Sequence, residues 1–377
     1  MTRLLARDLG SGHTVACDFR GGLLRIGPAG GEPAEGIFLS PGWVDLQVNG
    51  FGGLDLNNGQ VTAETVSGLA RRLWAEGVAA FCPTVVTAST AQIELSLSAI
   101  ARACQADPDA RAAILAVHLE GPYLSLEAGA RGAHDPRYLR PPDWNEFSRW
   151  QALSKGAIRL VTLAPELPGA LDFIRRAVGA GLVVALGHTH ASTAELAAAV
   201  DAGARLSTHL GNGIGATLPR HPNPIWDQLA DDRLWASFIF DGHHLPASVM
   251  RVAWRAKGPA RSVLVSDATA PAGMPPGRYD IMGGQAELLA NGRLQLAGTP
   301  YLAGSASSLR EGVDNAVGLA GCTLQQAVRM VTENPLRLLG STLADAHTLF
   351  HWDAARQRSH VLKTILGGRV VYSAGGI

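Results

Sequence analysis

The sequence is poor in cysteine, in net charge and in long apolar runs, and each absence argues against a class of protein. Its four cysteines, Cys17, Cys82, Cys104 and Cys322, form no C-x-x-C pair. That spacing argues against a zinc ribbon and a disulfide framework, and it suits a reducing compartment. The formal net charge is +0 and no basic block occurs. Nucleic acid and an anionic membrane are therefore not expected as partners.

The sequence also gives no indication of a targeting segment or a membrane anchor. No apolar run approaches the roughly 20 residues that cross a bilayer. The first residues, MTRLLARDLGSG, show neither a long apolar core nor a small-residue cleavage site. We therefore expect no signal peptide and a cytoplasmic location. With 377 residues, 47% of them hydrophobic, the chain has room for a barrel and an accessory piece.

The middle of the chain alternates short apolar runs with Ala- and Leu-rich segments of helical spacing. The expected strands are 43–48, 79–86, 113–119, 158–163, 182–187, 205–209, 235–241 and 262–267. The expected helices are 61–76, 89–106, 168–179, 192–202, 246–256, 306–319 and 323–338. This alternation predicts an α/β fold, a parallel (β/α)8 barrel of the TIM type.

The two ends of the chain differ from the middle and are rich in short β-like runs, glycine and turns. Residues 1–40 and 345–377 are expected to pair into one small β domain, and residues 41–344 to form the barrel. Within the barrel, residues 277–300 look like a β-hairpin insertion with an Asn-Gly turn.

Polar residues that can carry chemistry stand at or just after the C-terminal ends of the expected strands. They are His118, Glu120, His188, His209, Asp241, His244 and Asp267. A parallel barrel gathers these strand ends on one face, where its active site is built. The sequence therefore predicts that these side chains lie together.

A metal site is the chemistry that three of these residues favour. Glu120, His188 and His209 would supply one carboxylate and two imidazoles and leave a fourth position for water, as catalytic zinc sites do. Asp267 would face that position and exchange a proton with the water. The alternatives are hydrogen-bonded structural histidines and a helix N-cap role for Asp267.

The motifs, taken in order, resemble those of a known family. PGWVDLQVNGFGGLD, HLEGPYL, GAHDP, GHTHAS, THLGNG, DGHHL, SDATAPAG, AGSASSL and TENPLRLLG are similar to N-acetylglucosamine-6-phosphate deacetylases of the amidohydrolase superfamily. The resemblance covers nearly the whole chain. It implies a metal-bearing barrel, a small β-sandwich from both termini, a homodimer and hydrolysis of the acetamide of an amino sugar.

The resemblance also implies residue roles. Glu120, His188 and His209 would hold one divalent ion, expected to be zinc, with iron, cobalt and manganese left open. Asp267 would be the general base and acid for a metal-activated water, and His134 would stabilise the oxyanion. The implied substrate contacts are Gln47, Ala133, His134, Asn212, Gly213, Arg220, Asp241, His244, Leu302, Ala303 and Gly304. Arg220 would reach the substrate phosphate in the neighbouring subunit's active site.

The first strand lacks the His-x-His that many metal-dependent barrel hydrolases carry. Gln47 and Asn49 occupy those two positions in WVDLQVNG. Amides are poor zinc ligands beside imidazole and carboxylate. The chain resembles the family branch with Gln and Asn here, which implies a single-metal site. Gln47 is then expected to hydrogen-bond water or substrate where a second metal would lie.

The loop after His209 departs from the family pattern. It reads Leu-Gly-Asn-Gly-Ile-Gly, where Asn-Ala-Met is usual. The expected reaction converts N-acetyl-D-glucosamine 6-phosphate to D-glucosamine 6-phosphate and acetate. An unphosphorylated or different N-acetyl amino sugar, or another N-acyl compound, is the alternative. An inactive scaffold on this fold is disfavoured because the candidate ligands and Asp267 are present. His190 and His243 have no assigned role.

Overall fold

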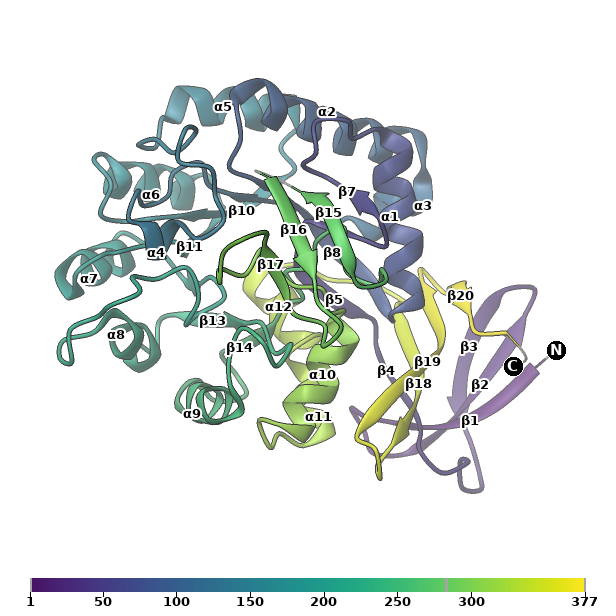
Figure 1. The fold of residues 1–377 in the computed structure, drawn as a ribbon. Helices are drawn as coiled ribbons and strands as arrows, with labels where there is room; N and C mark the ends of the chain where they lie inside the picture. The colour runs from purple at the N-terminus through teal and green to yellow at the C-terminus, as the bar shows by residue number, and fades with distance from the viewer. Residues whose placement is uncertain (1, 282–283, 376–377) are drawn as a thin grey trace.

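The computed structural model describes residues 2–281 and 284–375, and in it helices surround a sheet of parallel strands (Figure 1). The eight strands are β5 Trp43–Val48, β8 Val78–Val86, β9 Val117–Glu120, β10 Ile158–Leu163, β11 Val183–Leu186, β12 Leu206–Ser207, β13 Trp235–Phe238 and β14 Ser262–Leu264. They pair in chain order, with β5 and β14 as the outermost strands. The predicted α/β barrel class is confirmed.

The seam between β5 and β14 is closed at its C-terminal end by the chain that follows β14. Ala268 forms a parallel bridge with Val48. The N–H of Asp267 donates to the carbonyl of Gln47 at 3.0 Å, and the N–H of Asn49 donates to the carbonyl of Ala268 at 2.8 Å. The closure therefore brings the polar residues of β5 beside Asp267.

Carbonyl groups in the break between two helices accept hydrogen bonds that close the other end of this seam. The single helix predicted over 323–338 is wrong, because α11 Leu324–Arg329 and α12 Glu333–Leu339 are separate. Pro335 has no N–H for the carbonyl of Val331, four residues earlier. That carbonyl instead accepts from the N–H of Val44 at 2.7 Å, and the carbonyl of Met330 accepts from Leu264 at 3.1 Å. These carbonyls therefore bond to both outermost strands of the sheet and not to N–H groups of a continuous helix.

The remaining helices are α1 Ala63–Ala75, α2 Thr90–Ala106, α3 Pro108–Ala113, α4 Ala128–Arg131, α5 Trp144–Leu153, α6 Ala170–Gly179, α7 Thr193–Asp201, α8 Pro224–Ala230, α9 Ala247–Lys257 and α10 Leu309–Gly318. Capping boxes at Thr62, Ser192 and Ser308 begin α1, α7 and α10. The sequence prediction missed α3, α4, α5 and α8. Three of these span seven residues or fewer, too short for a helical period to be recognised.

Apolar packing lies mainly between the strands and the surrounding helices. The largest cluster includes Trp43, Phe81, Trp150 and Phe238, each at most 1% exposed. A smaller cluster joins strand residues such as Leu46 with Leu338 and Leu339 of α12. None of the helices in the described residues combines the length and the apolar character that crossing a membrane requires.

The two ends of the chain build one β unit beside the barrel, as predicted. Its strands are β1 Thr2–Asp8, β2 Thr14–Arg20, β3 Leu23–Pro28, β4 Ile37–Pro41, β18 His347–Asp353, β19 Arg358–Leu366 and β20 Arg369–Ser373. The sheet closes on itself because β1 pairs in parallel with β4. The hydroxyls of Thr348 and Thr364 donate to the carbonyls of Gly77 and Trp74, which ties the unit to the barrel.

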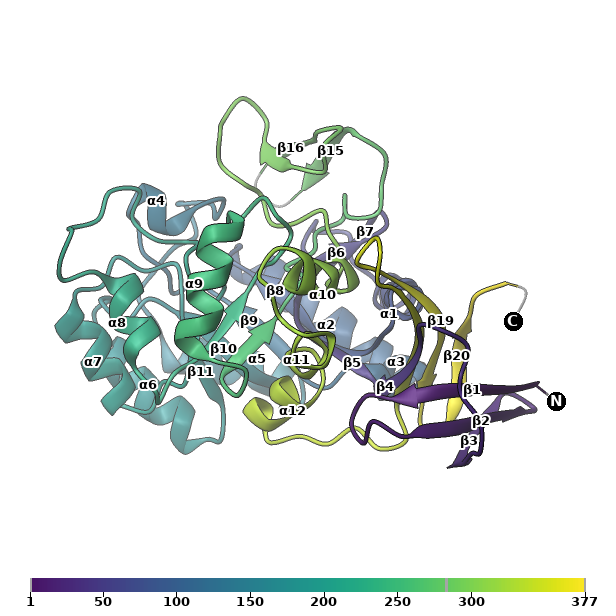
Figure 2. The same ribbon diagram turned by 90° about the horizontal axis from the view of Figure 1, so that it is seen from below.

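An insertion follows β14 and projects from the body of the molecule (Figure 2). Its strands β15 Gly277–Ile281, β16 Gly284–Leu288 and β17 Leu294–Leu296 form an antiparallel sheet. The predicted Asn-Gly turn lies between β16 and β17, so the expected hairpin gains a third strand. Residues 282–283 of the predicted hairpin lie outside the described residues. A two-stranded hairpin, β6 Gly50–Phe51 and β7 Leu54–Asp55, follows β5.

Asp45 is a fully buried carboxyl group at the barrel seam. Its Oδ1 accepts from the N–H groups of Gln47 and Ser266, both at 3.2 Å. Burial raises the pKa of Asp45 to about 7, although the hydrogen bonds from Ser266 and Gln47 oppose the shift. The folded state therefore keeps this proton at pH values where the unfolded chain has lost it.

We expect an Asp45→Asn variant to change how stability depends on pH. Because the folded pKa is raised, Asp45 makes the free energy of unfolding fall as pH rises from about 4 to 7, by at most about 1.4 kcal/mol per unit. The amide of the variant keeps an oxygen acceptor and removes this dependence. Urea unfolding of both proteins at pH 5, 6 and 7 should show that the free energy of unfolding of the variant increases relative to that of the wild type as pH rises. The exposed Asp232→Asn is the control, and a pH-independent difference for Asp45→Asn would contradict the expectation.

Candidate active site

Most of the polar residues predicted to meet lie at the C-terminal end of the barrel, where the backbone is strained. His118 instead lies inside β9, with its Nε2 2.7 Å from the hydroxyl of Thr162, and does not border the cavity described below. His188, His209 and Asp267 have φ angles of 50°, 31° and 49°. Residues other than glycine rarely adopt this left-handed backbone conformation. Each residue follows its strand by two or three positions, after β11, β12 and β14. Strain at such positions is typical of functional sites, where the surrounding structure enforces it.

Glu120, His188 and His209 form a buried cluster. The Oε1 atom of Glu120 lies 3.3 Å from Nε2 of His188 and 3.0 Å from Nε2 of His209, and the two Nε2 atoms are 3.1 Å apart. Burial opposes ionisation of Glu120, but hydrogen bonds and charge from both histidines hold its pKa well below the usual range. The cluster therefore contains a carboxylate facing two imidazole nitrogens.

The chemistry of these donors fits a divalent metal. The Nδ1 atom of His188 lies 2.8 Å from the carbonyl oxygen of Ala130. A carbonyl only accepts, so Nδ1 carries the proton and Nε2 presents its lone pair to the cluster. One carboxylate and two imidazole nitrogens that converge on one point, with a position left for water, match the donor set of a catalytic zinc site. The residues are thus a possible metal site.

His134 brings a further nitrogen to the same place. Its Nε2 lies 3.2 Å from Nε2 of His188. Ligand atoms of Glu120, His134 and His188 all lie within 4.8 Å of one another. Burial, reinforced by the charge of His188, lowers the pKa of His134 to about 3, so it is neutral near pH 7. The structure therefore offers four candidate donors where the sequence suggested three.

The carboxyl group of Asp267 accepts hydrogen bonds from two side-chain amides, one in β5 and one in the residue that follows β5. The Nδ2 of Asn49 donates to its Oδ1 at 2.7 Å, and the Nε2 of Gln47 donates to the same oxygen at 3.1 Å. No hydrogen bond of the described residues uses Oδ2. Burial and then the charge of Glu120 raise the pKa of Asp267 to about 7. A carboxyl group of this kind is suited to taking up and releasing a proton near neutral pH.

Gln47 bridges the two carboxylates. Its Nε2 also donates to Oε1 of Glu120 at 3.0 Å, and the side chain is buried. Both N–H groups of the amide are therefore used inside the protein. Any contact that Gln47 makes with water or substrate falls to its carbonyl oxygen. Asn49 was considered from sequence only as a replaced ligand, and its bond to Asp267 was missed.

His244 and Asp241 form a second hydrogen-bonded pair. The Nδ1 of His244 lies 2.7 Å from Oδ2 of Asp241, while Oδ1 accepts from the N–H groups of His243 and His244. Burial alone would raise the pKa of Asp241, but the bond and charge of His244 outweigh it and hold the pKa at about 2. No hydrogen bond of the described residues uses the Nε2 of His244, and His244 borders the cavity described below.

A cavity of about 490 Å³ connects these groups, a size typical of sites for small molecules. It is bordered by Asn49, Glu120, His188, His209 and Asp267, and by the predicted contacts Ala133, His134, Asn212, Gly213, His244, Leu302, Ala303 and Gly304. Three predicted contacts are absent from the lining: Gln47, Asp241 and Arg220. Gln47 and Asp241 are hydrogen-bonded to the lining residues Asp267 and His244.

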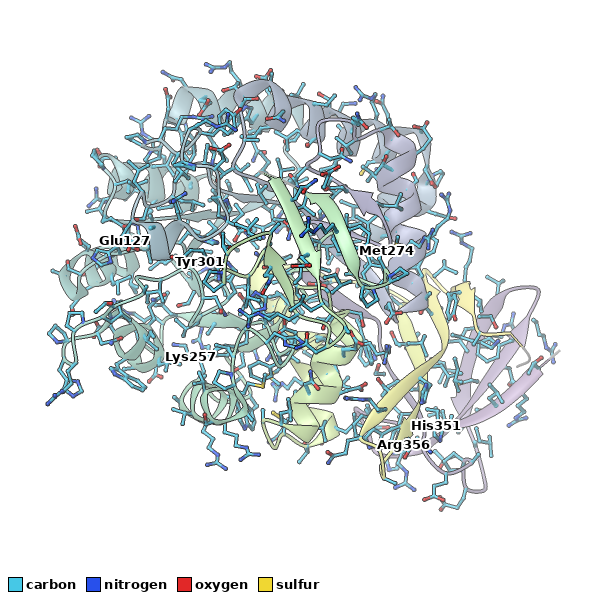
Figure 3. All side chains as sticks on the ribbon, viewed as in Figure 1. Glu127, Lys257, Met274, Tyr301, His351 and Arg356 are labelled. Carbon is cyan, nitrogen blue, oxygen red and sulfur yellow. The ribbon has the colours of Figure 1, made fainter. Side chains whose placement is uncertain are left out.

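The insertion supplies one side of this cavity. Ile281, Arg293, Pro300 and Tyr301 belong to the lining. Tyr301, 44% exposed, is labelled in Figure 3, where it lies beyond β17 on the side of α4. Sequence reasoning missed Arg293 and Tyr301, since nothing in a predicted hairpin indicates which way it folds over the barrel.

The unusual glycines of the loop after His209 are explained by close packing. A Cβ atom on Gly213 would stand 2.7 Å from Nδ1 of His188, and one on Gly215 would stand 2.8 Å from Nδ1 of His190. Gly213 also has a φ of 58°, which favours glycine. The loop can therefore cover both rings only without side chains here. His190 is itself exposed and lies outside the metal cluster.

Arg220 does not reach the cavity of its own subunit. It lies in the exposed part of the same loop and is not among the lining residues. Its predicted contact with the neighbouring active site stays a prediction, as does the homodimer that the contact requires.

Known proteins resemble this chain over most of its length. It is 36% identical over 304 residues to N-acetylgalactosamine-6-phosphate deacetylase of Escherichia coli O157:H7, covering 80% of this chain and 78% of that protein. It is 35% identical over 355 residues to N-acetylglucosamine-6-phosphate deacetylase of Bos taurus, covering 89% and 84%. No family model matches the chain.

Solved structures agree in fold. The N-acetyl-D-glucosamine-6-phosphate deacetylase of Mycobacterium smegmatis superimposes with a TM-score of 0.86 at 29% identity, covering 99% of this chain and 100% of that one. A variant of that enzyme in complex with N-acetyl-D-glucosamine 6-phosphate superimposes with a TM-score of 0.85, with the same coverage. An enamidase of the amidohydrolase superfamily, 13% identical, shares the fold at a TM-score of 0.53.

The four donors can be separated by their effect on metal content. We expect His209→Asn to lose the metal, because it removes one of the three expected ligands, and His134→Asn to retain it. Metal per subunit is measured by inductively coupled plasma mass spectrometry after dialysis, with one ion expected in the wild type. His190→Asn, two residues from His188 but outside the cluster, is the control. Loss of metal from the His134 variant alone would replace His209 by His134 in the ligand set.

Proposed function

The chain belongs to the N-acetylglucosamine-6-phosphate deacetylase family of the amidohydrolase superfamily, and on this premise we propose that it hydrolyses N-acetyl-D-glucosamine 6-phosphate. The products are D-glucosamine 6-phosphate and acetate. The chain is an amidohydrolase of this type, with relatives about 35% identical over about 90% of its length. The observation that carries the proposal is the meeting of Glu120, His188, His209 and Asp267 around one cavity.

We assign the metal to Glu120, His188 and His209, with zinc as the expected ion. A divalent ion held there would act as a Lewis acid, lowering the pKa of water and polarising the acetyl carbonyl. The protein's own contribution is to fix the donors: the Ala130 carbonyl sets the tautomer of His188, and Gln47 holds the carboxylate of Glu120. Such supporting bonds orient ligands and tune their basicity.

Asp267 acts as the general base and then the general acid. Its Oδ1 is held by Asn49 and Gln47, so Oδ2 takes the proton from the attacking water. The tetrahedral oxyanion forms beside His134, whose neutral ring has one N–H to donate. Asp267 then returns the proton to the sugar nitrogen as the C–N bond breaks and acetate leaves.

The far side of the cavity binds the sugar. Asn212 and Gly213 border it from the loop after His209. Leu302, Ala303 and Gly304 border it from the segment that follows β17. His244 borders it as well, and its Nε2 is free to bond the sugar. Arg220 would complete a neighbouring subunit's site in a homodimer of a cytoplasmic enzyme. The division into a barrel at 41–344 and a β domain at 1–40 plus 345–377 is part of this proposal.

A second candidate substrate is N-acetylgalactosamine 6-phosphate. The relative from Escherichia coli O157:H7, 36% identical over 304 residues, is named for it. The two sugars differ in one hydroxyl configuration, and the same acetamide chemistry serves both. The choice between them depends on the sugar-binding side of the cavity and not on the metal cluster.

Substrate preference tests the proposed function directly. We expect acetate release from N-acetylglucosamine 6-phosphate with a kcat/KM well above that for free N-acetylglucosamine. N-acetylgalactosamine 6-phosphate is assayed in parallel with the same metal-analysed sample. Faster turnover of the galactosamine compound would favour the second candidate. Equal turnover of phosphorylated and free sugar would remove the phosphate from the assignment.

The role of Asp267 is tested by Asp267→Asn. The amide keeps the size of the side chain but cannot accept the proton, so kcat should fall by about 10²- to 10⁴-fold. Metal content should be unchanged, because Asp267 is outside the proposed ligand set. Full activity with metal retained would rule out Asp267 as the base.

A further inference from the structure

Arg293 is an unpaired cation at the cavity. It directly precedes β17 and is one of the residues that line the cavity, together with Glu120, His188 and Asp267. The other arginine of the lining, Arg137, is occupied: its Nε donates to both carboxylate oxygens of Asp135, at 3.0 and 2.9 Å. Among the described residues that line the cavity, Arg293 is the one arginine or lysine without an ion pair.

The guanidinium of Arg293 is held in place but not used up. One terminal nitrogen donates to the carbonyl of Pro300 at 2.9 Å, across the turn that follows β17. A guanidinium carries five N–H donors in a fixed plane, and no other side-chain hydrogen bond of Arg293 is present in the described structure. Several donors therefore remain for an anion, in a geometry suited to two oxygens of a phosphate.

The position of Arg293 is coupled to the catalytic centre through the main chain. Ala303 donates to the carbonyl of Leu294, so β17 is tied to the segment that lines the cavity. Two residues further on, the N–H of Ser305 donates to the carbonyl of Asp267 at 3.0 Å. Two main-chain hydrogen bonds therefore connect the strand that follows Arg293 with the backbone of Asp267.

His243 supports the same corner. A Cβ atom on Gly292 would stand 3.4 Å from Nε2 of His243, so the imidazole lies against the turn that carries Arg293. His243 also lines the cavity. Arg220, the arginine that the family resemblance assigns to the phosphate, is outside the cavity of its own subunit. Within one subunit the unpaired guanidinium at this site is that of Arg293.

We propose that Arg293 binds the phosphate of the amino-sugar substrate from within the same subunit and determines the preference for phosphorylated over free sugar. The inference rests on the proposed function, since it concerns the phosphate of that substrate. The insertion is then a specificity element: the barrel supplies the hydrolytic groups, and β15–β17 recognise the end of the sugar away from the acetamide.

The test compares Arg293→Gln and Arg293→Lys with the wild type on N-acetylglucosamine 6-phosphate and on free N-acetylglucosamine. The glutamine variant should lose about 10- to 100-fold in kcat/KM on the phosphorylated sugar, mainly through KM, and change little on the free sugar. The lysine variant keeps the charge and should retain part of the preference. Arg278→Gln, an exposed arginine of the same insertion outside the cavity, is the matched control.

Binding of the product gives a readout independent of turnover. Calorimetry should show weaker binding of glucosamine 6-phosphate to Arg293→Gln and no change for glucosamine. Equal losses on both sugars would mean that Arg293 only braces the Pro300 turn, and would overturn the proposal. So would a preference retained in Arg293→Gln and lost in Arg220→Gln. A wild type without any preference for the phosphorylated sugar defeats the proposed function itself, before any variant is compared.

Discussion

The site depends on keeping two buried carboxyl groups, Glu120 and Asp267, close together with different protonation behaviour. Two negative charges in a region of low dielectric repel strongly. Gln47 donates one N–H to each group, and the imidazoles of His188 and His209 pair with Glu120. The pKa of Glu120 is held low while that of Asp267 rises to about 7. One carboxylate is therefore suited to holding a cation and the other to moving a proton.

Closure of the barrel makes that arrangement possible. Gln47 and Asn49 belong to the first part of the chain, and Asp267 lies three residues beyond the last strand of the sheet. The residues meet because the main chain after β14 bonds to β5 at one end and the carbonyls of Met330 and Val331 bond to β14 and β5 at the other. The strained φ values of His188, His209 and Asp267 persist in this frame, since neighbouring strands hold the backbone on both sides.

Chemistry and recognition come from different parts of the molecule. Glu120, His188 and His209 lie at or just beyond strand ends, where parallel packing limits movement, whereas the proposed sugar-binding side is formed by the glycine loop after His209 and by the insertion. Loops on a rigid frame change specificity without disturbing the reacting groups. Relatives named for N-acetylglucosamine 6-phosphate and for N-acetylgalactosamine 6-phosphate are consistent with one hydrolytic centre combined with different recognition segments.

Much of the frame was predictable from local patterns. Alternation of apolar runs and helical spacing predicted the barrel, and β5 and β10 have the predicted bounds. Glu120, His188, His209 and Asp267 could be placed on one face because parallel strands present their C-terminal ends together. Pro335 could have warned of the break between α11 and α12, but apolar spacing continued across it. Asp143, which caps α5, was a similar signal that the prediction did not use.

The sequence by itself determined which chemical groups stand at the strand ends, because that depends on local spacing along the chain. Only the tertiary structure decided how they pair: that Gln47 bridges two carboxylates, that His134 joins the donor cluster, and that Arg293 lines the cavity while Arg220 does not. These relations join residues tens to hundreds of positions apart. Their distances follow from barrel closure and from the direction in which the insertion folds, and periodicity in the sequence carries no information about either.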